Sequence, residues 1–134
     1  MKFEIIPFER VGSLAFGMKR EKVREILGPD FRTFRKSSWS VNTTDDYTAL
    51  GVHLYYTEHD ELEFVEMFSP TEPIFMGVNL LENAENTLRL LRKVDPDPET
   101  DDAGYTFHKI GIALHIEYKL EAVSAFRKGY YSST

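Results

Sequence analysis

Two pairs of adjacent carboxylates, Asp45-Asp46 and Asp101-Asp102, are the first candidates for chemistry in this chain. Each pair directly follows a threonine, and neighbouring carboxylates are among the groups that general acid–base catalysis uses. Aspartate also caps backbone groups in turns that precede strands, and this structural role explains both pairs without any reaction. We therefore predict no catalytic residue at either pair.

The histidines do not have the spacing of a metal site. None of them forms the i, i+4 pair with a glutamate that a metalloprotease helix supplies. They are His53, His59, His108 and His115. We interpret them as surface or strand residues, and a site that combines His59 with Glu58 or Asp60 stays an alternative.

The acidic stretch DPDPETDD, residues 95–102, superficially resembles a calcium-binding loop. Counting from Asp95 puts Thr100 and Thr106 where an EF-hand needs glycine and glutamate. The chain also lacks a glycine-rich phosphate loop, a nucleophile elbow and a Rossmann fingerprint. The sequence therefore predicts no metal, no cofactor and no enzymatic activity.

Acidic residues are unevenly distributed in this chain, whose formal net charge is −6. Between Ser37 and Leu88 there are ten aspartates and glutamates and no lysine or arginine. Such a segment creates a negative field, which disfavours binding to nucleic acid and favours a basic protein partner. Ordinary solvent-facing carboxylates are the alternative interpretation. The predicted partner-binding residues are Glu58, Asp60, Glu61, Tyr55, Asp101 and Asp102.

The length and composition fit one folded domain over residues 1–134. The absence of cysteine excludes disulfides, thiolate metal sites and a cysteine nucleophile. Glu4 and Pro7 interrupt the apolar residues near the N-terminus, which is therefore a poor secretory signal. No stretch approaches the ~20 apolar residues of a membrane span. We expect a cytoplasmic protein with no membrane partner.

The elements that would position these residues occur twice. In the first half, Val23, Ile26 and Leu27 share one face of a short helix that ends at Gly28. The stretch LGVHLYYTEHDELEFVEMF then alternates as two strands of a hairpin, with its tip at His59-Asp60.

The second half follows the same order. Asn83 is the expected N-cap of a second helix, whose apolar face includes Leu88 and Leu91. The prolines of PDPETDDAG predict a loop, and IGIALHIEYKLEAVSAF then resembles the first hairpin, with Gly111 matching Gly51. We predict an α+β fold in which two helix-then-β-hairpin repeats, about 12–69 and 73–127, form an antiparallel sheet with both helices on one face.

The stretch LAFGMKREKVREILGPD, followed by Trp39 and a strand hairpin, resembles the repeat of the SmpA/OmlA lipoprotein family and of the β-lactamase inhibitory proteins. The tandem arrangement is more similar to the inhibitory proteins, which carry two such units. This resemblance implies a protein that grips an enzyme with an exposed sheet face and two loops.

Taken together, these patterns favour a non-catalytic protein-binding module. A cytoplasmic immunity or inhibitor protein that binds a basic partner through its sheet face and acidic loops would suit the predicted fold, size and charge. The alternative is a small-molecule-binding protein or minor enzyme with a pocket between sheet and helices.

Overall fold

Short strands dominate the computed structural model of the chain, which describes residues 1–131. Thirteen strands form two sheets, and only two helices accompany them within these residues. No helix of the described chain is long and apolar enough to cross a membrane.

The larger sheet has eight strands, and every neighbouring pair in it is antiparallel. The first half of the chain supplies four consecutive strands, the second half supplies the other four, and the halves meet where β7 pairs with β13. The spatial order is β10 (Glu99–Asp101), β11 (Gly104–Phe107), β12 (Ile112–Ile116), β13 (Leu120–Phe126), β7 (Leu62–Met67), β6 (Val52–Tyr56), β5 (Thr44–Tyr47) and β4 (Arg32–Phe34).

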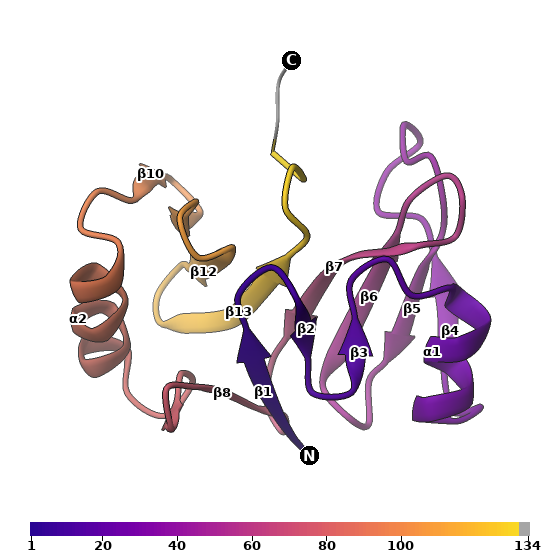
Figure 1. The fold of residues 1–134 in the computed structure, drawn as a ribbon, viewed down its shortest axis with the longest axis horizontal. Helices are drawn as coiled ribbons and strands as arrows, with labels where there is room; N and C mark the ends of the chain where they lie inside the picture. The colour runs from indigo at the N-terminus through magenta and orange to yellow at the C-terminus, as the bar shows by residue number, and fades with distance from the viewer. Residues whose placement is uncertain (132–134) are drawn as a thin grey trace.

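The smaller sheet has five strands and also combines both halves, because β1 pairs in parallel with β8. Figure 1 shows β1, β2 and β3 in front of the larger sheet, with the two helices on either side of them. The order is β3 (Leu14–Ala15), β2 (Arg10–Val11), β1 (Lys2–Ile6), β8 (Glu72–Phe75) and β9 (Val78–Asn79); the helices are α1 (Arg20–Leu27) and α2 (Ala84–Val94).

The core lies between the two sheets. In β6, Val52 and Leu54 are buried on the side that faces the smaller sheet, where Phe3 and Ile5 belong to the same buried cluster. We call this side of the larger sheet the core face. The other side, which carries His53 and the other residues of the same alternation, is the open face.

Local backbone chemistry marks the start of α2 and the end of α1. The Asn83 side chain accepts a hydrogen bond from the backbone N–H of Asn86, which confirms the predicted N-cap of α2. Gly28 ends α1 with a positive φ of 95°, a conformation that glycine adopts without a steric cost. Val23 and Leu91 are buried as predicted, whereas Ile26 is exposed.

The predicted fold class, an α+β arrangement of two helix-then-hairpin repeats with helices packed on an antiparallel sheet, is wrong. The chain is mostly β, with sheets of eight and five strands and helices of only 8 and 11 residues. Each helix is followed by four strands of the larger sheet rather than by a single hairpin, and β8 and β9 of the smaller sheet also come between the two helices. The single domain and the repeat boundaries at about 12–69 and 73–127 stay predictions.

The strands that sequence analysis missed are short and polar. The sequence predicts turn chemistry for the pair Asp45-Asp46, yet both residues lie in β5, between β4 and β6. Glu99–Asp101 lies in the predicted loop, yet it pairs with β11 as an exposed edge strand. Neighbouring strands supply the pairing that these sequences do not indicate by themselves.

The burial of Leu91 predicts a large stability difference within α2. Leu91 is 0% exposed and Val94 is 38% exposed. Leu91→Ala should lower the free energy of unfolding by about 2–5 kcal/mol, since it leaves a cavity in the core. Val94→Ala serves as the control on the same helix and should cost well below that. Urea unfolding of both variants measures the difference, and similar losses would contradict the packing of α2.

Candidate functional site

A buried ion cluster joins α1 to the larger sheet. Asp45, in the middle of β5, is 0% exposed on the core face. Arg24 donates from Nε to Asp45 Oδ2 and from Nη2 to Oδ1, both at 2.8 Å, and Arg20 Nη1 lies 3.4 Å from Oδ1. The bidentate Arg24 contact fixes the orientation of both groups and raises the pKa of Arg24. Asp45 is therefore a helix anchor, which the turn interpretation did not foresee.

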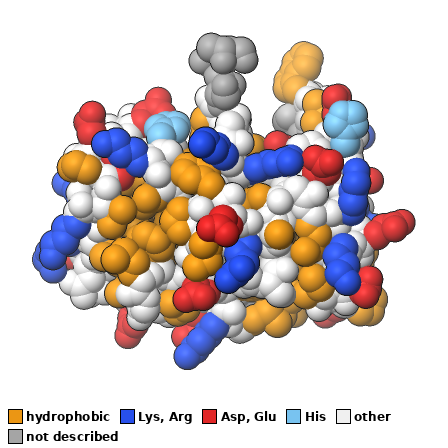
Figure 2. All heavy atoms as spheres, in the orientation of Figure 1, with side chains coloured by type: hydrophobic (Ala, Val, Ile, Leu, Met, Phe, Trp, Pro, Cys, Tyr) orange, Lys and Arg blue, Asp and Glu red, His pale blue; other side chains and the backbone are white. Residues whose placement is uncertain are grey.

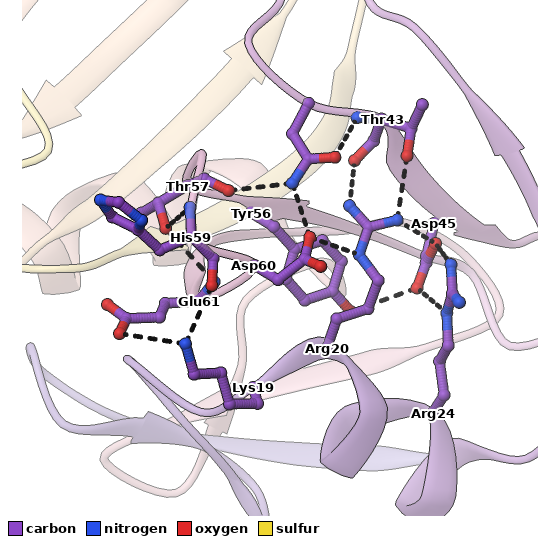
Figure 3. Close-up of polar contacts among 11 residues, drawn as sticks. Lys19, Arg20, Arg24, Thr43, Asp45, Tyr56, Thr57, His59, Asp60 and Glu61 are labelled. Atoms are coloured by element: carbon purple, nitrogen blue, oxygen red, sulfur yellow. Dashed lines mark hydrogen bonds and ion pairs between the residues drawn. The ribbon is translucent and has the colours of Figure 1, made fainter.

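Arg20 extends this cluster to two loops, as Figure 3 shows. Its Nη2 donates to the Thr43 carbonyl at 2.7 Å, and its guanidinium stacks on the Tyr56 ring at 4.2 Å. Its Nε lies 3.2 Å from Asp60 Oδ1, in a geometry that gives charge contact without a hydrogen bond. One arginine thus holds the β4–β5 loop (residues 35–43) and the tip of the β6–β7 hairpin (residues 57–61).

The hairpin tip has the predicted position, but two of its three predicted binding carboxylates are paired within the molecule. Besides contacting Arg20, Asp60 accepts a hydrogen bond from Asn42 Nδ2 at 2.7 Å. Glu61 contacts Arg127 at 3.2 Å and Lys19 at 3.6 Å, and the hydrogen bond from Arg127 is the main cause of its lowered pKa. Glu58 is exposed, with His59 its only ionic neighbour within residues 1–131.

The β4–β5 loop presents large apolar side chains to solvent. Trp39 is 88% exposed and Val41 is 71% exposed. The loop nevertheless has its own hydrogen bonds: Arg35 Nη1 donates to the Ser40 carbonyl at 2.7 Å, and the Ser37 N–H donates to Ser40 Oγ at 3.1 Å. Figure 1 shows this loop projecting beyond the sheet, and in Figure 2 a hydrophobic side chain lies at the end of a matching projection.

On the open face, strand register brings Asp46, His53 and Glu66 into one row. Asp46 lies opposite His53 in β6, which lies opposite Glu66 in β7. His53 Nδ1 is 3.0 Å from Glu66 Oε1, and Nε2 is 3.2 Å from Asp46 Oδ1. The carboxylates occupy opposite sides of the ring, and within residues 1–131 no three such groups are arranged to hold a metal ion.

The two carboxylates favour the charged form of His53. Burial alone would lower the pKa of His53, but the hydrogen bond with Glu66 and the charge of Asp46 outweigh it, so the pKa is raised above 6.5. The same hydrogen bond lowers the pKa of Glu66 below 4.5, although burial opposes this. Rings of Phe34 and Phe68 pack edge-on against the imidazole.

Tyr55, the predicted aromatic contact, lies on the same open face. Its hydroxyl donates to Glu66 Oε1 at 3.4 Å, and burial raises its pKa. The Lys36 ammonium lies 5.3 Å from the centre of the Tyr55 ring. Tyr55 is therefore half-covered by the chain itself.

Two cavities of about 170 and 220 Å³ share Lys36 as a lining residue. The smaller is lined by the β4–β5 loop together with Tyr55, Glu63 and Tyr130. The larger also includes Glu66 and Asp101, so side chains from both edges of the sheet line one hollow. Open-face residues line both cavities, whereas the sequence placed a pocket between sheet and helices.

Asp101 and Asp102 lie far along the strands from the other predicted residues. The strands alternate in direction from the β6–β7 tip through β13, β12 and β11, so the β10–β11 turn lies at their opposite end. Asp101 Oδ1 accepts hydrogen bonds from the N–H groups of Ala103 at 2.8 Å and Gly104 at 3.0 Å, as turn chemistry predicts. No contact joins this turn to the hairpin tip within residues 1–131.

Sequence reasoning did not select Trp39, Lys36, Glu63, Glu66 or His53 as site residues. The alternation of HLYY with LEFVE could have placed His53 and Glu66 on one face, because side chains in a strand alternate with a period of two. The proximity of Lys36 depends on the path of a loop, which alternation does not describe.

Comparisons with protein-family models, with curated proteins and with solved structures find no match to the chain.

Removal of the Asp45 carboxylate should destabilise the protein strongly. Asp45→Ala leaves Arg20 and Arg24 without their buried counter-charge, which typically costs about 3–5 kcal/mol. Glu25→Ala is the control, because Glu25 forms only an exposed pair with Lys22 and should cost less than about 1 kcal/mol. Equal urea midpoints for the two variants would show that α1 is held by other contacts.

The open-face row should give the protein a measurable pH dependence. Since the pKa of His53 is raised above 6.5, its stabilisation is complete below that pH and is lost as the pH rises through the folded-state pKa. Between about pH 6 and pH 8 the wild type should therefore lose stability relative to His53→Gln. Unfolding free energies measured across this range test the prediction, and parallel curves for the two proteins would refute it.

Proposed function

We propose that this chain is a non-catalytic protein-binding module whose hydrophobic anchor is the β4–β5 loop. The observation that carries this proposal is the exposure of Trp39 and Val41 on a loop held by its own hydrogen bonds. Tryptophan is enriched among residues that dominate binding energy, and a pre-ordered loop loses little entropy on association.

The neighbouring hairpin supports a continuous binding surface. Asn42 Nδ2, at the end of the loop, donates to the Thr57 carbonyl at 2.9 Å as well as to Asp60. The loop and the hairpin tip therefore move together as one unit. The cavities of the open face adjoin this unit, so a partner that contacts Trp39 also reaches the sheet.

Charge favours a partner with basic side chains. The net charge of −6 attracts a basic protein over long range, and at the tip Glu58 has no lysine or arginine partner within residues 1–131. Asp60 and Glu61 serve mainly to hold the tip in place, because arginine and lysine neighbours already balance their charges. Asp101 and Asp102 lie at the opposite end of the strands from the tip, so a partner that reaches both regions extends across the sheet. An immunity or inhibitor protein, acting by blocking the site of a basic toxin or enzyme, fits this arrangement.

Trp39→Ala should weaken partner binding while leaving the fold intact. A central aromatic anchor is worth about 2 kcal/mol or more, which corresponds to a roughly 30-fold rise in Kd. The partner is isolated by affinity capture from the source cell, and Kd and association rates are then measured with purified proteins. Tyr118→Ala is the matched control, since Tyr118 is 101% exposed in the β12–β13 turn at the other end of the strands.

A second variant tests the charge component separately. Glu58→Lys should slow association and reduce its dependence on salt, because steering acts mainly on the association rate. Equal affinities of Trp39→Ala, Tyr118→Ala and the wild type would overturn the assignment of the anchor. If Glu58→Lys associates with the partner at the wild-type rate, the proposal that Glu58 steers a basic partner is wrong.

A further inference from the structure

A β-bulge directs Glu63 toward the smaller cavity. Tyr55 lies opposite Phe64, whereas the next residue, Tyr56, lies opposite Leu62, so Glu63 is the extra residue of β7. A bulge of this kind re-aims one side chain relative to the regular alternation. Glu63 lines the cavity together with Tyr55 and Tyr130.

The Glu63 carboxylate has no hydrogen bond or ion pair with residues 1–131, although it is half-buried. Arg127 donates its backbone N–H to the Glu63 carbonyl at 2.8 Å, but its guanidinium contacts Glu61 instead. Burial raises the pKa of Glu63, and the charge of Arg127 offsets this only in part. A half-buried carboxylate without a partner is stabilised by any cation that enters the cavity.

The chain already places one cation in this region. The Lys36 ammonium lies over the Tyr55 ring at 5.3 Å, and its charge helps to lower the pKa of Glu66 after the larger effect of His53. Lys36 forms no hydrogen bond or ion pair within the described chain, and its side chain is exposed. An aromatic face with nearby carboxylates is the arrangement that proteins use to recognise alkylammonium and guanidinium groups.

We propose that the two open-face cavities form a receptor for a cationic alkylammonium or guanidinium group, and that Lys36 is a displaceable internal occupant of it. The carboxylates of Glu63, Glu66 and Asp101 line the cavities, whereas Lys36 is the only lysine or arginine among residues 1–131 that does so. Moving Lys36 aside therefore leaves a hollow with acidic and tyrosine walls. The cation is either a basic side chain of a protein or a free amine, and this inference does not depend on the role of Trp39.

The test uses Lys36→Met, which keeps an unbranched side chain one atom shorter than that of lysine and removes its charge. The probes are N-acetyl-arginine amide and N-acetyl-lysine amide, which present a single basic side chain, with N-acetyl-norleucine amide as the neutral control and spermidine as the free amine. Binding is followed by calorimetry and by the NMR shifts of the Tyr55 and Glu63 amides. Lys22→Met is the matched control, because Lys22 pairs with Glu25 on the exposed side of α1.

Lys36→Met should bind the arginine or lysine probe about tenfold more tightly than the wild type or Lys22→Met, since the probe no longer competes with Lys36 for the Tyr55 ring and the carboxylates. Adding Glu63→Gln should reverse most of this gain. Tyr55→Leu, which retains an apolar side chain, should reduce it as well, and melting curves show whether each variant is folded.

The probes also distinguish the source of the cation. Preference for the blocked amino acids over spermidine identifies a protein side chain, and the opposite preference identifies a free polyamine; both outcomes support the receptor. Equal affinities of Lys36→Met and the wild type, no binding up to about 10 mM, or equal binding of the norleucine probe would overturn it. Trp39→Ala should leave these titrations unchanged, so failure here is separate from failure of the Trp39 anchor.

Discussion

The burial of Asp45 between two arginines is the constraint on which the first half of the molecule depends. A carboxylate at this depth is tolerated only while its counter-charges stay in place, because an unpaired buried charge is very unfavourable. The position of α1, a helix of 8 residues, is therefore fixed by ion geometry as well as by the burial of Val23. Arg20, in α1, contacts both the β4–β5 loop and the hairpin tip, so these two segments are fixed relative to the helix.

On the open face, carboxylates lie close to cationic side chains of the same chain, which offset part of their negative charge. His53 lies between Asp46 and Glu66, and the Lys36 ammonium lies over the Tyr55 ring, where its charge also acts on Glu66. Within the acidic segment between residues 37 and 88, Asp46 and Glu66 therefore share a cationic neighbour when His53 is protonated. Glu58 at the hairpin tip and Glu63 in the smaller cavity, by contrast, have no lysine or arginine partner within residues 1–131.

Features that depend on a few adjacent residues could be predicted from the sequence, and those that depend on distant pairing could not. The stop at Gly28, the cap at Asn83 and the hairpin tip near His59 each follow from local backbone chemistry. The class of fold does not, because β5 and β10 are polar segments that become strands only beside their neighbours. Likewise, the sequence showed that Asp60 and Glu61 are acidic but not that Arg20, Lys19 and Arg127 would neutralise them.

The parallel pairing of β1 with β8 has a consequence for how the chain acquires its structure during synthesis. Lys2 and Phe3 align with Glu72 and Pro73, so β1 lacks one of its two strand partners until β8 has been synthesised. In the meantime one edge of β1 is open to incorrect association with other chains. The β7–β13 pair imposes a still longer delay on the larger sheet. Both sheets can therefore be completed only after strands that lie far along the chain from their partners have been synthesised, and such long-range pairing slows folding.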